Sequence, residues 1–242
     1  MIAATGKAAL RAVGLTSLAL LLLTAAAGAE DPRSATLDAA MTEPFAAAVD
    51  GGPRRFELVA SAGTQIRAAP DRRAGFVAPL DAGAIVANLG CEATPGGVWC
   101  AVQPIGGRLR GYVEAVKLRP ARGPDGVVPM GPNDSPARAQ RGAIDASGEI
   151  RCAMDRGQPW ARCRAEIARA GGGDATVVAT FPNGFKRRLY YVDRSFIRAD
   201  VTMSGTGRDF DWLLVGGTHR VRVDDQRFEL PDTLIFGRPD LQ

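Results

Sequence analysis

The apolar positions of residues 54–122 fall in short runs separated by Gly, Pro and Asp. Short runs with frequent turn residues are typical of strands in a small all-β domain. We expect strands at Phe56–Val59, Ile66–Pro70, Gly75–Leu80, Ala84–Leu89, Val98–Val102 and Arg110–Val113. So many strands in fewer than about 70 residues predict a small barrel or sandwich.

A second β pattern covers residues 145–238. An Asn-Gly pair at 183–184 and a Gly-Gly pair at 216–217 each separate two apolar runs, which predicts two hairpins. We expect strands at Thr176–Phe181, Phe185–Val192, Phe196–Thr202, Phe210–Val215, Thr218–Val223 and Arg227–Leu230. Together with the apolar residues around 150–168, they predict an antiparallel sheet of six or seven strands and a closing helical turn within Pro231–Phe236.

Two segments lack a core pattern. Residues 30–53 are rich in Ala and acidic residues, and we expect a mostly mobile leader or linker there. Residues 123–144 carry repeated Pro and Gly, which predicts a linker between two domains at 54–122 and 145–238.

The first 29 residues have the pattern of a secretory signal peptide. Lys7 and Arg11 precede an uncharged Leu-rich run, and small residues end the segment at Ala29. The run is shorter than the roughly 20 apolar residues that span a bilayer. We therefore expect cleavage after Ala29, a periplasmic location and no membrane span in the mature chain.

Export changes how the four cysteines are interpreted. They form two close pairs, Cys91/Cys100 and Cys152/Cys163, and an oxidising compartment favours disulfides. Three pairings are possible, and we expect the two local ones because each pair falls in a different domain. The chain has one histidine and no C-x-x-C, so a zinc site is disfavoured, and we expect no metal or cofactor.

Charge limits the partner classes. Removal of the signal peptide leaves 28 basic and 26 acidic residues, a net charge of +2, which does not favour a nucleic-acid partner. Residues 54–122 alone carry ten basic and five acidic residues. Such a module can hold an anionic wall polymer or the carboxylates of peptide stems. A solvated surface in an Arg-rich chain is an equal alternative.

Order and spacing in the first domain give a resemblance. The residues that carry it are Gln65–Pro70, Leu80, Gly83, Ile85-Val86, Leu89–Cys91, Trp99-Cys100, Val102, Gly111–Val113 and Leu118. With them, residues 54–122 resemble the bacterial Src-homology-3-like family of exported modules. Thr64 and Ala69 depart from the usual Leu and Gly of that family.

The resemblance implies a small β-barrel that recognises peptidoglycan or peptide ligands. Residues 145–238 look like the tails of exported proteins that carry such a module, and these tails have no known activity. The chain is therefore expected to be mostly β, with a small Src-homology-3-like β-barrel followed by a second small antiparallel β-sheet domain.

Five residues of the first domain are candidates for ligand binding. Trp99 and Tyr112 could form an aromatic shelf, although core packing is more common for aromatic residues in the middle of strands. Arg67, Arg72 and Arg73 lie in or beside the first loop and could hold carboxylates.

The second domain offers weaker signals. His219 stands on the apolar face of a strand, where a packed histidine is more common than a catalytic one. No G-x-S-x-G or S-x-x-K motif occurs, and none of the thirteen acids of this domain is singled out as a catalytic pair. The three glycines at 171–173 predict a flexible turn, and the basic run at 186–188 predicts a solvent face.

These observations favour a non-enzymatic adaptor that binds peptidoglycan or an envelope protein. Two alternatives stay open: an inhibitor or assembly partner of an exported enzyme, and a carboxylate-dependent envelope hydrolase. The missing histidine, thiol and metal sets disfavour the hydrolase.

Overall fold

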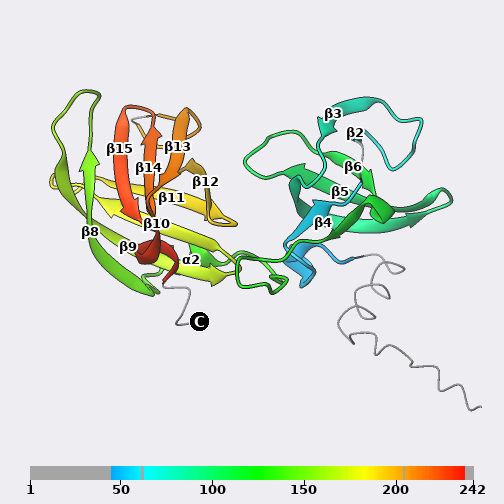
Figure 1. Ribbon diagram of the computed structural model, residues 1–242, viewed down its shortest axis with the longest axis horizontal. Helices are drawn as coiled ribbons and strands as arrows, with labels where there is room; N and C mark the ends of the chain where they lie inside the picture. The colour runs from blue at the N-terminus through cyan, green and yellow to red at the C-terminus, as the bar shows by residue number, and fades with distance from the viewer. Residues whose placement is uncertain (1–44, 61–62, 204, 238–242) are drawn as a thin grey trace, which may run out of the picture.

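We describe the protein from a computed structural model, which defines residues 45–60, 63–203 and 205–237. The predicted signal peptide and residues 30–44 lie outside the described residues. The chain is mostly β, as predicted, and forms two antiparallel sheets that lie side by side in Figure 1. No helix in the described part is long and apolar enough to cross a membrane.

The first sheet has seven strands in the order β3-β2-β6-β5-β4-β1-β7. Its strands enclose one apolar core that includes Phe56, Ile66, Val86 and Val113. A short 3-10 helix, η2 (Ala115–Lys117), joins the two strands of this sheet that come last along the chain. The strands are β1 (Arg55–Leu58), β2 (Thr64–Arg67), β3 (Phe76–Leu80), β4 (Ile85–Thr94), β5 (Gly97–Pro104), β6 (Gly111–Glu114) and β7 (Leu118–Pro120).

The second sheet has eight strands, more than the six or seven expected, in the order β12-β11-β10-β9-β8-β15-β14-β13. Both predicted hairpins form, between β10 and β11 and between β13 and β14. The strands are β8 (Ala146–Ala153), β9 (Ala161–Gly171), β10 (Asp174–Thr180), β11 (Lys186–Val192), β12 (Ser195–Ala199), β13 (Phe210–Val215), β14 (Thr218–Val223) and β15 (Gln226–Pro231).

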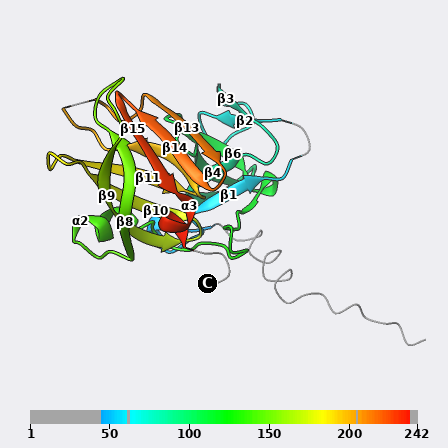
Figure 2. The same ribbon diagram turned by 60° about the vertical axis from the view of Figure 1, so that its left-hand side comes forward.

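This second sheet curls until its two edge strands approach each other. Phe196 of β12 and Phe210 of β13 meet with ring centroids 5.0 Å apart, although these strands are not neighbours in the hydrogen-bonded order. The predicted helical turn is α3 (Asp232–Phe236), which contacts β8, β9, β10 and β15 at one end of the curl (Figure 2). The curl therefore encloses an almost closed barrel-like core.

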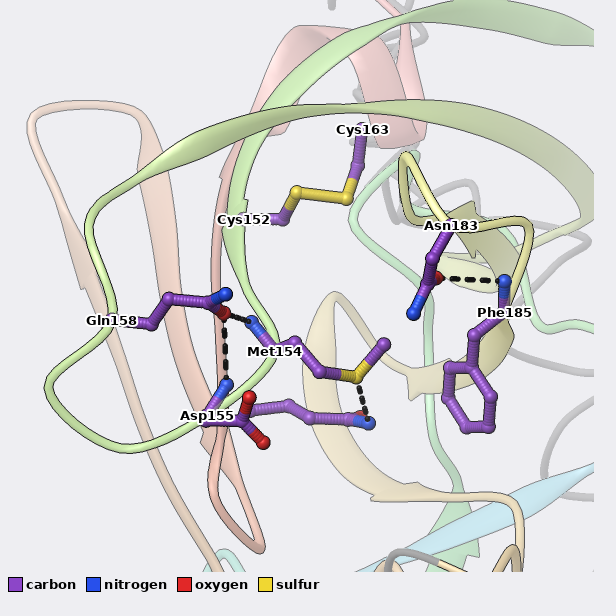
Figure 3. Close-up of a disulfide and its surroundings, with 8 residues drawn as sticks. Cys152, Met154, Asp155, Gln158, Cys163, Asn183 and Phe185 are labelled. Atoms are coloured by element: carbon purple, nitrogen blue, oxygen red, sulfur yellow. Dashed lines mark hydrogen bonds between the residues drawn. A yellow bond between two sulfur atoms is a disulfide. The ribbon is translucent and has the colours of Figure 1, made fainter.

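Both predicted disulfides are confirmed. Cys91 of β4 lies directly opposite Cys100 of β5, and their sulfurs are 2.04 Å apart. Cys152 of β8 and Cys163 of β9 are bonded where the two strands approach the loop that joins them (Figure 3). In that loop Gln158 Oε1 accepts the backbone N–H of Met154, which fixes the turn.

The end of the expected leader, residues 45–53, is folded against the first sheet. Phe45 packs on Phe56 with ring centroids 5.5 Å apart. The Asn88 amide donates to the carbonyls of Ala46 and Pro53, at 2.8 Å in each case. The prediction of a mobile segment is therefore wrong for these residues, because a buried amide and an aromatic contact hold them.

The segment expected to be a linker between the domains also makes ordered contacts. It contains α2 (Ser135–Gln140), which packs on β9 and β10. The Ser135 and Thr176 hydroxyls, both buried, are 3.0 Å apart. Upstream, Arg54 N donates to Pro129 O at 2.8 Å, so the same segment is also hydrogen-bonded to the start of β1. Proline and glycine here shape a docked connection instead of a loose tether.

Arg54 and Arg55, at the start of β1, join the two sheets. Arg55 Nη1 donates to Asp174 Oδ1 at 2.5 Å, and both side chains are almost completely buried. Arg54 Nη1 donates to the other oxygen of the same carboxylate at 3.0 Å. Asp174 is the first residue of β10 in the second sheet. Its carboxylate therefore binds two arginines at the start of the first sheet.

The glycine turn at 171–173 completes this contact. Arg55 Nη2 donates to Gly172 O at 2.5 Å, and Arg54 Nη1 donates to Gly171 O at 3.2 Å. Gly172 has a φ of +60°, and a Cβ atom there would lie 2.6 Å from the Pro129 side chain. The turn expected to be flexible is therefore a docking point, and close approach of Pro129 requires glycine.

The basic run at 186–188 does not form a uniform solvent face. Lys186 is exposed, as expected, but Arg187 is completely buried because strand alternation points it into the curled sheet. Its guanidinium lies 2.6 Å from Asp224 and 3.5 Å from Asp200 and also donates to Thr202. Two partly buried carboxylates compensate the charge of Arg187, and strand alternation alone does not predict this pairing.

Arg55→Met should lower the free energy of unfolding by about 3–5 kcal/mol, because it leaves the Asp174 carboxylate buried beside a weakened partner set. Urea unfolding of the oxidised protein measures this loss. Arg119→Met is the matched control: Arg119 pairs with Glu57 on the surface of the same sheet, and its removal should cost about 0.5 kcal/mol or less. Equal losses in both variants would contradict a stabilising role of the Arg55–Asp174 contact between the sheets.

Candidate functional site

Trp99 lies on the outer face of the first sheet. Side chains alternate between the two faces along β5. Cys100 and Val102 point into the core, so Trp99 points outward. The side chain is nevertheless only 3% exposed. It forms a wall of two surface hollows, and Arg72 lines both of them.

The larger hollow has a volume of about 500 Å³ and lies where β2 and β6 separate. The described pairing of these two strands is limited to Arg67 opposite Tyr112. Beyond that pair the strands diverge, and the hollow opens between the start of β2 and the end of β6. Its lining residues are Gly63, Thr64, Gln65, Arg67, Arg72, Trp99, Glu114 and Lys117.

The smaller hollow, of about 370 Å³, lies on the other side of Arg72. The loop between β2 and β3 forms one wall, where Asp71 Oδ1 accepts the Arg73 backbone N–H at 2.7 Å. The β4–β5 turn forms the other. The lining residues are Pro70, Asp71, Arg72, Arg73, Thr94, Pro95, Gly96 and Trp99. We call the two hollows together the Trp99 groove.

An ion-pair cluster of Glu114, Arg72 and Lys117 lines the larger hollow, and its Arg72 also lines the smaller one. Glu114 lies opposite Trp99 on the neighbouring strand and contacts Arg72 Nε at 2.5 Å and Lys117 Nζ at 2.8 Å. Burial opposes ionisation of Glu114, but the hydrogen bonds and charges of Lys117 and Arg72 outweigh it and hold its pKa below the usual range. Glu114 therefore stays an anion that positions both cations.

Arg72 keeps binding capacity despite this ion pair. Its side chain is 76% exposed, and it contacts Glu114 through Nε. Among the described residues nothing pairs with its two terminal nitrogens. A guanidinium held by one edge can present its terminal N–H groups to a second carboxylate in bidentate geometry.

The structure brings together four of the five predicted ligand residues. Trp99, Arg67, Arg72 and Arg73 all line the Trp99 groove. Tyr112 is on the same face but opposite Ala101, and it lines neither hollow. The aromatic shelf predicted from Trp99 and Tyr112 therefore does not form at this groove.

Sequence reasoning missed Glu114 and Lys117. Glu114 is two positions after Tyr112, so strand alternation puts both residues on one face of the sheet. This spacing is a sequence signal that could have identified Glu114 as a site residue. Lys117 reaches the groove from η2, a short 3-10 helix that no periodicity predicts. Their contribution depends on the β5–β6 register, which sequence alone does not define.

His219 is a packed residue, as interpreted from the sequence, with both ring nitrogens occupied. Trp212 Nε1–H donates to Nδ1 at 3.0 Å, and Nε2 lies 3.0 Å from Asp232 Oδ1. This pattern requires the neutral tautomer with its proton on Nε2. Burial lowers the pKa of His219, and the bond to Asp232 offsets this only in part. No ring nitrogen remains to accept a proton from a nucleophile.

The free energy of unfolding should therefore fall as the pH drops below about 6.5, because the unfolded chain then binds a proton at His219 that the folded chain excludes. The loss continues down to the lowered pKa of the folded state, with a slope of at most about 1.4 kcal/mol per pH unit. Urea unfolding at several pH values measures it. His219→Gln keeps partners for Trp212 and Asp232 and should lose this slope; an unchanged slope would contradict the assignment.

Carboxylate pairs of the second sheet are held by arginines. Asp174 and Asp193 lie 2.5 Å and 3.7 Å from Arg55. Asp200 and Asp224 share Arg187 in the same way. Glycoside cleavage needs two carboxyl groups facing a substrate across a cleft, and a guanidinium fills that space in both pairs. Within the described residues no group of three His, Cys, Asp or Glu side chains could hold a metal ion.

No family model, curated protein or solved structure matches this chain. The resemblance of residues 54–122 to the Src-homology-3-like family therefore stays an expectation from sequence. What the structure shows is a mostly-β fold of two antiparallel sheets with two disulfides.

Proposed function

We propose that this is an exported, non-enzymatic binding protein whose Trp99 groove holds carboxylate-bearing peptides of the cell wall. Export is supported by the pattern of residues 1–29 and by two disulfides, which persist in oxidising compartments. The groove residues supply the recognition chemistry.

One observation carries the proposal: Arg72 forms the shared wall of both hollows and is held there by the buried Glu114 carboxylate. Arg67, Arg73 and Lys117 surround it, so four cations line the groove against Glu114 and Asp71. This excess of positive charge fits an anionic ligand. Peptidoglycan stem peptides present carboxylates on short, extended chains, which matches a groove that runs past a central guanidinium.

The neutral lining favours a peptide over a purely charged polymer. Thr64 and Gln65 offer polar groups at the start of β2, where the strand has separated from β6. Pro70, Pro95 and the indole of Trp99 give the smaller hollow apolar walls. Because Trp99 is almost covered, it supports the wall of the groove and is not a platform for stacking.

Arg72→Glu should reduce retention on peptidoglycan sacculi at least about fivefold, because it replaces the proposed carboxylate contact with a like charge beside Glu114. Cosedimentation of the purified, oxidised protein with isolated sacculi measures this. Arg119→Glu makes the same change in net charge on the same sheet, where Arg119 pairs with Glu57, and should retain binding.

Three results distinguish the possibilities. Selective loss with Arg72→Glu, together with weakening by salt, supports the groove. Equal loss in both variants would mean that binding follows net charge alone and would overturn the assigned site. No retention of the unmodified protein would overturn the wall-binding function and direct the search to a protein partner.

A further inference from the structure

β13 is an edge strand with an unpaired side. It pairs with β14 from Phe210 opposite Val223 to Val215 opposite Thr218, and no described residue pairs with its other side. β12 approaches it at Phe210, through the ring of Phe196. Natural proteins usually protect such edges with charged side chains, proline or a bulge, and the part of β13 after Asp211 carries none of these.

The far half of this strand is apolar and exposed on both faces. Leu213 is 57% exposed, Leu214 43% and Val215 44%, with both sheets of the chain in place. Leu213 points to the outer face, beside a groove of about 270 Å³ that Trp160 also lines. Three consecutive exposed aliphatic side chains on an open edge form a surface suited to another strand.

Charges next to this edge are already paired within the chain. Arg222 lies 2.6 Å from Asp211 and 3.0 Å from Asp209. Arg220 contacts Glu229 at 3.6 Å. A partner strand therefore meets apolar side chains and internally paired charges, so an uncharged apolar strand is complementary to it. Residues 212–215 of a second copy are such a strand.

The hairpin geometry defines which backbone groups are available. A two-residue turn, Gly216-Gly217 with φ of +56° and +72°, closes the β13–β14 hairpin. In such a hairpin every second residue of β13 forms its backbone hydrogen bonds with β14. Asp224 N donates to Asp209 O, which shows that the odd-numbered residues of β13 are the ones bonded to β14. The N–H and C=O groups of Trp212 and Leu214 therefore point to the free edge.

We propose that this edge pairs with the same edge of a second copy of the chain, antiparallel about a two-fold axis through Leu213. Residues opposite each other in an antiparallel pair point to the same face, which restricts the axis to a residue position. With the axis at Leu213, the backbone groups of Trp212 bond to those of Leu214 in the second copy. Leu213 then lies opposite Leu213 of the second copy. Asp211 then faces Val215, so no like charges meet.

The pairing forms a weak dimer. A contact of one short strand falls below the roughly 1,200 Å² of stable interfaces, so dissociation constants in the micromolar to millimolar range follow. Because apolar side chains and backbone bonds hold it, association should not weaken with salt. This distinguishes it from binding at the Trp99 groove, and it does not depend on that function.

Sedimentation equilibrium of the full protein over a wide concentration range tests the pairing. We expect the average mass to approach twice the monomer mass at high concentration. Leu213→Lys and Leu213→Asp should each weaken association at least about tenfold, and an equimolar mixture of the two should recover it, because the axis brings the opposite charges together. Val49→Lys is the control and should not alter the mass, because Val49 is also an exposed apolar residue but lies in the 3-10 helix η1 (Ala48–Asp50), which precedes β1.

A cysteine variant tests the register even where association is weak. Leu213→Cys should oxidise to a covalent dimer, since residues across the axis have Cβ atoms about 5 Å apart, and Leu214→Cys should do so at least about tenfold more slowly. The four native cysteines are already bonded in two pairs and do not compete. A monomer at every concentration, or equal cross-linking at both positions, would overturn the proposal.

Discussion

The buried contact of Arg55 with Asp174 is the constraint on which the arrangement of the two sheets depends. Both side chains are almost inaccessible, so either charge alone would be strongly destabilising, and each side chain requires the other sheet to be in place. Arg54 and the glycine turn at 171–173 add bonds to the same point. The two sheets therefore fold as one body joined at the start of β1.

The Arg55–Asp174 contact also explains why the connecting segments are ordered. Residues 45–53 and 123–144 have the composition of linkers, but 45–53 precede Arg54 directly and the first part of 123–144 contacts Arg54 and the glycine turn. Pro129 closes over Gly172, and Phe45 and Asn88 fix the approach to β1. The Trp99 groove and the free edge of β13 belong to different sheets, which the Arg55–Asp174 contact joins.

The sequence predicts the local structure well because local rules determine it. Alternation gives the strands, the Gly-Gly turn at 216–217 gives the last hairpin, and spacing gives both disulfides. It misses what depends on contacts between distant residues. Arg187 is buried because two acids from other loops compensate its charge. Glu114 and Lys117 join the groove only through the strand register and a 3-10 turn.

Differential scanning calorimetry of the oxidised protein tests the central claim most directly, since it shows whether the two sheets unfold together. The account predicts a single transition whose calorimetric and van't Hoff enthalpies agree, as for one cooperative unit. Two separable transitions, or a calorimetric enthalpy well above the van't Hoff value, would show that the Arg55–Asp174 contact does not unite the sheets and would contradict the account.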